Sequence, residues 1–209
     1  MSDKGVLTVI SGFSGAGKGT VVKQLLDKYD YVLSISATTR SPREGEQDGR
    51  EYFFKTKEEF ERMIAEHQLI EYARYVGNYY GTPKEYVVQQ LEQGKDVILE
   101  IEMQGALHVR EILPEANLIF LTPPAVDVLE NRLRGRGTET EEVIRNRMAR
   151  AKEECSYMEQ YDYIVVNDDL DTCVNEVHGI ITSEHLKMRR RLEFVTNIRE
   201  DLQGLMKGE

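Results

Sequence analysis

Residues 11–20 read Ser11-Gly12-Phe13-Ser14-Gly15-Ala16-Gly17-Lys18-Gly19-Thr20. An apolar run at 6–10 precedes this stretch, and the helix-like run 21–26 follows it. A strand that leads into a glycine-rich loop and then into a helix is the context that a phosphate-binding loop (P-loop) requires. We therefore predict a P-loop, because a chance glycine-rich turn would not combine the strand, the spacing, the lysine and the helix.

Each residue type in this loop has a physical role. Glycines at positions 12, 15 and 17 allow the backbone to curl until successive N–H groups point inward. The start of the next helix adds unpaired N–H groups and the positive end of its dipole. Lys18 supplies a mobile cation for β- and γ-phosphates. The strict pattern has Ser or Thr directly after the lysine, but here Gly19 stands before Thr20, so we assign the hydroxyl that approaches Mg²⁺ to Thr20, directly or through water.

Length and charge limit the possible functions. With 209 residues, the chain forms one domain or one domain with insertions. The formal net charge of −10 disfavours nonspecific binding of nucleic acid, so positive charge for phosphates must be concentrated locally. Cys155 and Cys173 have no metal-like spacing and are typical of a reducing compartment. The sequence contains no recognisable signal peptide or membrane span, so we expect a cytoplasmic protein without a membrane partner.

The strand-like runs indicate a parallel α/β sheet. They lie at 6–10, 31–37, 97–101, 118–122 and 163–166, and helical stretches separate most of them. The region from about 39 to 95 differs, because short strand-like runs at 51–54 and 69–76 flank a helix at 57–67. Thr56 and Glu59 fit a capping box at the start of that helix. We interpret this region as a small α+β insertion, with Gly94 as the C-cap of its last helix.

Two later helical stretches have apolar residues at helical spacing. We expect the first set to pack in the core: Ile144, Met148, Ala151, Cys155 and Met158. The second set lies near the C-terminus: Leu192, Val195, Ile198, Leu202 and Leu205. This second face either packs on the sheet of its own chain or contacts another subunit.

Arginines and tyrosines gather in turn-forming segments. Arg40 and Arg43 lie in one such segment, Arg136 lies in the glycine-punctuated loop 135–140, and Arg147 lies at the start of the helix that follows. Guanidinium groups bind phosphate oxygens in pairs, so two arginine clusters beside a P-loop indicate two phosphate groups. The aromatic-rich segment 77–82 is predicted as a turn whose tyrosines either pack on the sheet or bind a phosphate through their hydroxyls.

With these motifs in order, the chain resembles the guanylate kinase family over about residues 5–185. The segments that carry the resemblance are 34–45, 49–54, 77–82, 99–105, 135–141 and 166–170. The segment of Arg40 and Arg43, together with 78–82, is highly specific, whereas the P-loop alone marks only a superfamily. Residues beyond about 187 resemble nothing in the family.

The resemblance implies a fold and a reaction. The fold is a three-layer αβα P-loop core (1–37 and 96–187) with a GMP-binding insertion (38–95), a helical lid (about 125–158) and a C-terminal extension (188–209). The reaction transfers the γ-phosphoryl group of ATP to GMP, or dGMP, with Mg²⁺, to give ADP and GDP. The implied ATP-binding residues are Gly12, Phe13, Ser14, Gly15, Ala16, Gly17, Lys18, Gly19 and Thr20.

The family also implies the acceptor site and the lid arginines. Arg40, Arg43, Tyr52 and Tyr80 match the residues that hold the GMP phosphate. Ser36, Glu71, Thr82 and Glu102 match the residues on the guanine side. Arg136 and Arg147 match lid arginines and, with Lys18 and Arg40, make up the predicted catalytic set. Glu100 and Glu102 stand where Asp is also common in the family.

Three other functions remain to be weighed. A guanylate-kinase-like interaction module would bind peptides without catalysis, but such modules lose P-loop or acceptor-site residues that are present here. Another small-molecule kinase with the same core would differ in the nucleotide it accepts. A GTPase is disfavoured, because Val166-Asn167-Asp168-Asp169 is not the Asn-Lys-x-Asp motif that reads guanine.

Overall fold

The computed structural model describes residues 4–75, 77–135 and 140–206. Its centre is a parallel sheet with the strand order β2-β7-β1-β8-β9. The strands are β1 (Leu7–Gly12), β2 (Tyr31–Leu33), β7 (Asp96–Glu100), β8 (Asn117–Thr122) and β9 (Tyr163–Val166). The predicted parallel α/β sheet is therefore confirmed.

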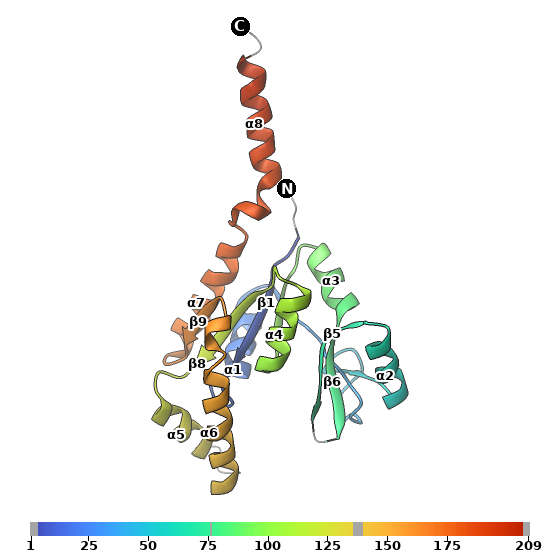
Figure 1. The fold of residues 1–209 in the computed structure, drawn as a ribbon, viewed down its shortest axis with the longest axis vertical. Helices are drawn as coiled ribbons and strands as arrows, with labels where there is room; N and C mark the ends of the chain where they lie inside the picture. The colour runs from blue at the N-terminus through green and yellow to red at the C-terminus, as the bar shows by residue number, and fades with distance from the viewer. Residues whose placement is uncertain (1–3, 76, 136–139, 207–209) are drawn as a thin grey trace.

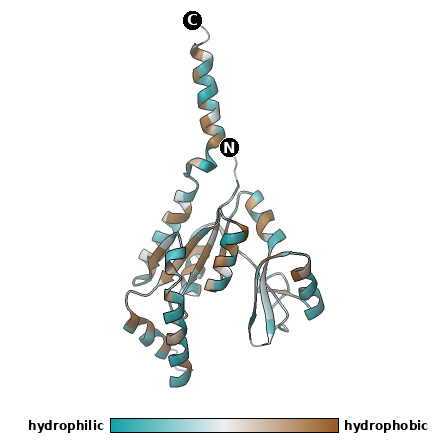
Figure 2. Cartoon of the chain, viewed as in Figure 1, coloured by the Kyte–Doolittle hydropathy of each residue, from teal (hydrophilic) through white to brown (hydrophobic). Residues whose placement is uncertain are grey.

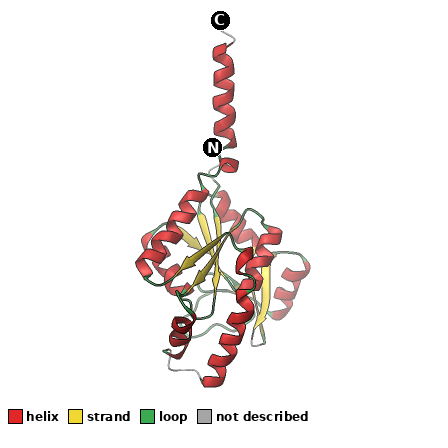
Figure 3. Cartoon of the chain, turned by 60° about the vertical axis from the view of Figure 1, so that its left-hand side comes forward, coloured by secondary structure: helices red, strands yellow, loops and turns green. Residues whose placement is uncertain are grey.

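Helices cover both faces of this sheet (Figure 3). Val6 and Ile10 pack with helices α1 (Lys18–Lys28) and α7 (Leu170–Glu184), because alternate residues of a strand point to opposite faces. Leu7 and Val9 pack on the other face with helices α3 (Lys84–Glu92) and α4 (Met103–Ile112). The three layers that we predicted are present.

A second, smaller sheet lies beside the first, as Figure 1 shows. Its order is β4-β3-β6-β5, with β3 (Ala37–Thr38), β4 (Phe53–Phe54), β5 (Leu69–Tyr75) and β6 (Asn78–Pro83). Helix α2 (Lys57–Ala65) covers it through Phe60, which is fully buried against Ala37 and Leu69. This cluster gives the insertion its own small core.

Two of the predicted local structures were wrong. The run 31–37 is not one strand: β2 pairs with β7 in the main sheet, whereas β3 pairs with β4 and β6 in the second sheet. The segment 77–82 is not a turn, because residues 78–83 form strand β6 between β3 and β5. In both cases tertiary pairing decides the structure, which local sequence preference does not report.

The helix ends of the insertion follow their sequence signals. The Thr56 hydroxyl accepts the Glu59 N–H at 3.1 Å, and the Glu59 carboxylate accepts the Thr56 N–H at 2.7 Å, so the capping box is confirmed. Gly94 has φ 78° just past α3, where its N–H donates to Leu91 O and the next N–H donates to Gln90 O. The predicted C-cap role of Gly94 is confirmed as well.

The lid region contains helices α5 (Val126–Arg134) and α6 (Glu141–Cys155), followed by the short helix η1 (Met158–Gln160). Ile144 and Ala151 of α6 are buried, and Met148 and Met158 are partly buried beside them, as predicted. Cys155 is exposed at the last turn of α6, so its predicted place in the core was wrong.

The C-terminal helix α8 (Leu192–Met206) follows the short helix η2 (Met188–Arg190) and extends away from the rest of the chain (Figure 1). Figure 2 shows apolar residues along it, and Leu205 is 73% exposed. Packing of this helix on its own sheet was therefore a wrong alternative, because other helices already cover both sheet faces. The Arg190 guanidinium, which donates to Lys4 O at 2.9 Å, instead holds the base of α8 beside the N-terminus. Among the described residues, no helix is both long and apolar enough to cross a membrane.

We predict that Thr56→Ala lowers the free energy of unfolding by about 1 kcal/mol, because the variant loses one bond of the capping box. Urea unfolding followed by circular dichroism measures this change. Thr56→Ser, which keeps the hydroxyl, is the control and should retain most of the stability. Equal stability of Thr56→Ala and the parent chain would show that the box contributes nothing.

Candidate active site

The P-loop is shaped by backbone contacts that exclude side chains. Gly12 has φ 149°, and a Cβ atom there would lie 2.0 Å from Leu121 O. Gly17 has φ 91° at the N-cap of α1, and a Cβ atom there would lie 2.5 Å from Asn167 Nδ2. Only glycine fits such positions, so the loop can wrap closely around a bound anion at the start of α1.

Asn167 holds this loop from the end of strand β9. The buried side-chain amide of Asn167 donates to Ala16 O at 2.8 Å, and the backbone carbonyl of Asn167 accepts from Arg132 Nη2 at 2.9 Å. The sequence analysis quoted Asn167 only within a family segment and gave it no role. Its position directly after strand β9 was the available signal.

Lys18 and Glu100 lie at the same end of the sheet. Lys18 Nζ donates to Gly12 O at 2.8 Å and to Phe13 O at 3.3 Å, so the ammonium folds back over the loop. A Cβ atom on Gly19 would lie 3.5 Å from Glu100 Oε1, which places that carboxylate beside the first turn of α1. Burial raises the pKa of Glu100, and the charge of Lys18 opposes this rise.

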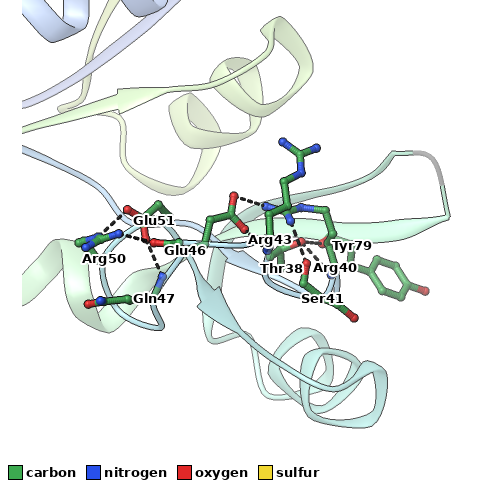
Figure 4. A network of polar contacts seen from close by, with 10 residues as sticks. Thr38, Arg40, Ser41, Arg43, Glu46, Gln47, Arg50, Glu51 and Tyr79 are labelled. Atoms are coloured by element: carbon green, nitrogen blue, oxygen red, sulfur yellow. Dashed lines mark hydrogen bonds and ion pairs between the residues drawn. The ribbon is translucent and has the colours of Figure 1, made fainter.

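The insertion brings arginine and tyrosine side chains together, and Figure 4 shows the part of this network formed by Arg40, Arg43 and Glu46. The Arg40 guanidinium lies 5.3 Å from the centre of the Tyr52 ring, and the Tyr52 and Tyr80 rings are 6.0 Å apart. Arg40 Nη2 pairs with Glu46 Oε1 at 2.9 Å, while Glu46 Oε2 accepts the backbone N–H of Arg43 at 2.7 Å. These bonds hold the pKa of Glu46 below its usual range.

Glu46 thus fixes the turn that carries both predicted phosphate-binding arginines. The sequence analysis did not assign it a role, because a glutamate in a charged turn is most often a surface residue. Its spacing of three residues from Arg43 was the only local signal.

Glu71 is a buried carboxylate at the junction between the insertion and the core. It is 8% exposed, and its Oε1 accepts a hydrogen bond from Thr82 Oγ1 at 2.7 Å. A Cβ atom on Gly105 of α4 would lie 3.0 Å from Glu71 Oε2, so the carboxylate packs closely against this helix. Burial raises the pKa of Glu71, and the Thr82 hydrogen bond partly offsets the rise.

A cavity lies between the insertion and the end of β7. Its lining includes Ser36 and Tyr52 of the insertion side, Thr82 of β6, and Glu100 at the end of β7. Three of the residues that we predicted for the acceptor, Ser36, Tyr52 and Thr82, therefore face one space.

The lid contributes Arg147 from α6. Its Nη1 donates to Ser14 Oγ of the P-loop at 3.3 Å, so the lid helix already contacts the loop. Arg136 lies outside the described residues, and its predicted role stays a prediction. Glu102 does not line this cavity, and its Oε2 accepts a hydrogen bond from Arg150 of α6 at 3.1 Å. Arg150 and its partner Glu154 had no role in the sequence analysis, although their spacing of four residues on a helix was a signal.

This geometry serves two phosphate-bearing ligands. The P-loop takes one. In the insertion, Arg40 lies over the ring of Tyr52, which lines the cavity, and the buried Glu71 is bonded to Thr82, which also lines it. An arrangement that seats two nucleotides and brings no nucleophilic side chain of its own is that of a P-loop kinase acting on nucleoside monophosphates.

Comparisons with known proteins narrow this class. The guanylate kinase family model matches residues 4–184. The guanylate kinase of Bacillus subtilis (strain 168) is 54% identical over 192 residues, which are 91% of this chain and 94% of that protein. The guanylate kinase of Caldanaerobacter subterraneus subsp. tengcongensis is 51% identical over 199 residues, covering 95% and 97%.

A solved structure agrees with these relatives. The crystal structure of guanylate kinase from Anaplasma phagocytophilum matches with a TM-score of 0.70 and 32% identity, covering 90% of each chain. The chain belongs to the guanylate kinase family and is a phosphotransferase of that kind.

Burial of Glu71 leads to a prediction about pH. Guanine offers two donors to an acceptor, so the ionised carboxylate is the form that binds it. Because burial raises the Glu71 pKa in the free protein, protonation sets in at a higher pH than for an exposed glutamate. We expect kcat/KM for GMP to fall as pH decreases through this raised pKa, and rates from about pH 8 down to about pH 4.5 at saturating ATP measure it. If kcat/KM for GMP stays constant until the pH reaches the usual range of glutamate pKa values, in a chain that stays folded, this assignment is contradicted.

Proposed function

We propose that this guanylate kinase binds ATP on residues 12–20 and GMP in the insertion, and transfers the γ-phosphoryl group between them. The bond from the γ-phosphorus to the oxygen bridging it to the β-phosphate breaks, and a bond to a phosphate oxygen of GMP forms, giving ADP and GDP. The observation that carries the proposal is the buried pair of Glu71 and Thr82, because Thr82 lines the same cavity as Ser36 and Tyr52.

Glu71 selects the base. Guanine presents its N1–H and its 2-amino group side by side, and a carboxylate accepts both at once. Adenine would place the lone pair of its N1 against this charge and would leave the carboxylate unpaired, so it is rejected by repulsion as well as by lost contacts. Ser36 can donate to the O6 edge of guanine, Thr82 stays on the guanine side as the donor to Glu71, and Glu102 shares the amino group.

Arg40, Arg43, Tyr52 and Tyr80 hold the acceptor phosphate. The planar guanidinium of arginine binds phosphate through two hydrogen bonds at once, so the orientation of the side chain determines how well it binds. The Glu46 contacts support this role, since they fix the Arg40 side chain and the Arg43 backbone before any ligand arrives. The tyrosine hydroxyls donate without bringing a further full charge into the site.

Lys18, Arg136 and Arg147 stabilise the charge on the transferring group. Phosphoryl transfer needs in-line positioning, charge neutralisation and exclusion of water more than it needs a general base. The contact between Arg147 and Ser14 supports the lid role of α6. The insertion and the lid should approach each other when both nucleotides are bound, because water must leave the site.

The oxygen donors near α1 fit Mg²⁺. The described residues contain no group of three or more metal-ligating side chains. Mg²⁺ is commonly held by one or two protein oxygens together with substrate phosphates, and Thr20 and Glu100 offer such oxygens beside the P-loop. When bound with ATP, the ion would neutralise charge on the β- and γ-phosphates.

Three finer assignments complete the proposal, and they concern the compartment, the peptide-binding alternative and the acceptor nucleotides. We place the enzyme in the cytoplasm, which is supported by two cysteines that are free thiols. Lys18, Arg40, Arg43 and Glu71 are all present, which disfavours a module that only binds peptides. We assign GMP as the acceptor and include dGMP, since none of the assigned contacts involves the 2′-hydroxyl.

The test is Glu71→Gln, because an amide has one acceptor atom where the carboxylate has two. We expect kcat/KM for GMP to fall by about 30- to 150-fold, equivalent to about 2–3 kcal/mol, and the GMP/AMP preference to narrow. ATP affinity should hardly change. Steady-state rates with GMP, AMP, CMP and UMP measure these effects, and Glu58→Gln on exposed α2 is the matched control. A variant that keeps the GMP preference and rate would move base selection to Glu102 and Ser36.

The apolar face of α8 pairs with α8 of a second copy. The helix has 15 residues, a length at which an isolated helix is marginal in water. Its apolar positions are also nearly symmetric about the helix centre: in an antiparallel pair Leu192 meets Leu205, Val195 meets Leu202, and Ile198 lies next to the two-fold axis. An interface between identical copies requires this kind of self-complementary surface.

We predict that Ile198→Asp converts a dimer into a monomer, because two carboxylates would then meet next to the axis. Light scattering measures the mass, and Thr196→Asp on the opposite side of α8 is the control that should stay dimeric. Activity with GMP should be kept in both variants. A monomeric mass for the unaltered chain at tens of micromolar would rule out the α8 pair.

A further inference from the structure

One face of lid helix α6 is directed toward the active site. Arg147, Arg150 and Glu154 follow one another at intervals of three and four residues, so they lie on the same side of the helix. Arg147 contacts Ser14 of the P-loop. The next turn of this face carries Arg150, which the reaction described above does not use.

Arg150 connects the lid to a residue on the guanine side. Its Nη2 donates to Glu102 Oε2 at 3.1 Å, and its Nε donates to Glu154 Oε1 at 3.0 Å. The Glu154 side chain is only 5% exposed, so it is a fixed partner inside α6. The guanidinium therefore has one anchor on its own helix and reaches Glu102 with its other end.

Glu102 depends on such a partner. It is the N-cap residue of α4, yet its side chain makes no capping hydrogen bond to that helix, and 58% of the side chain is exposed. A half-exposed glutamate without a capping bond samples several rotamers, and ordering it on binding costs entropy. Arg150 occupies only Oε2, which leaves Oε1 available to accept a donor from a ligand.

The charges of neighbouring groups also favour the ion pair between Arg150 and Glu102. Glu102 lies close enough to Glu100 and Glu154 for its charge to act on both. Three carboxylates therefore gather here, with Lys18 and Arg150 as cations. When Lys18 turns to the phosphates of ATP, Arg150 remains as the counter-charge beside Glu102.

We propose that Arg150 is a positioning residue that holds Glu102 toward the 2-amino group of guanine and so links base recognition to the lid. The inference rests on the role of Glu102 in the proposed function. Arg150 does not touch the substrate; it acts through the orientation of Glu102. Lid position and selection of the 2-amino group are then coupled, because the contact exists only while α6 lies against the end of β7.

The test compares GMP with IMP, which keeps the N1–H and O6 of guanine but lacks the 2-amino group. Arg150→Ala should lower the ratio of kcat/KM for GMP to that for IMP by about three- to tenfold, the range for an ion pair that is partly exposed. Arg150→Lys, which keeps the charge, should restore part of the ratio. Arg145→Ala, an exposed arginine of the same helix, is the matched control and should leave the ratio unchanged.

A double-mutant cycle with Glu102→Gln locates the effect. Glu102→Gln should lower the same ratio, and Arg150→Ala should add little to it in that background. If Glu102→Gln leaves the ratio unchanged, the proposed role of Glu102 is wrong. If Glu102→Gln lowers the ratio but Arg150→Ala leaves it unchanged, the inference about Arg150 is wrong while the base assignment stands. The same conclusion follows if Arg150→Ala lowers the rates with GMP and IMP equally.

Stability needs a separate control, because Arg150→Ala leaves the buried Glu154 without its cation. The double variant Arg150→Ala with Glu154→Gln removes that charge and should show the same loss of the GMP/IMP ratio. A normal ratio in this folded double variant would overturn the inference.

Discussion

A buried negative charge at the junction of two sheets is the constraint on which the rest of this structure depends. Glu71 lies on β5 of the insertion, but its carboxylate lies close to α4 of the core, where a Cβ atom on Gly105 would come within 3.0 Å of Oε2. Desolvation of a carboxylate is costly, and the single hydroxyl of Thr82 offsets part of that cost. Thr82 supplies one donor to this carboxylate, and in the proposed function a guanine base would supply two more.

The acidic composition of the chain affects how its cations can bind phosphates. With a formal net charge of −10, the molecule has no general attraction for phosphates. Its useful cations are fixed by carboxylates instead: Glu46 holds Arg40, and Glu154 holds Arg150. An arginine that is already oriented loses less entropy on binding, so acidic neighbours can improve a phosphate or carboxylate site rather than weaken it.

Sequence reasoning located the P-loop, the sheet and the helix caps because each depends on neighbours within a few positions. It failed for residues 31–37 and 78–83, whose strands are defined by partners far along the chain. It also overlooked Glu46, Asn167 and Arg150, because a polar residue acquires such a role only when the fold brings its partner close. The assigned substrate contacts themselves remain predictions, and Arg136 lies outside the described residues.

The hydrogen bond from Arg190 to Lys4 O joins the base of α8 to the start of the described chain, at the amino edge of the parallel strands. The P-loop and the acceptor cavity lie at the opposite, carboxyl edge. Whatever is attached to either end, whether another domain, a tag or a second protomer on α8, therefore grows away from the chemistry. Two copies joined in this way would stand back to back, each with its lid and insertion facing open solvent, and each could complete its catalytic cycle without waiting for the other.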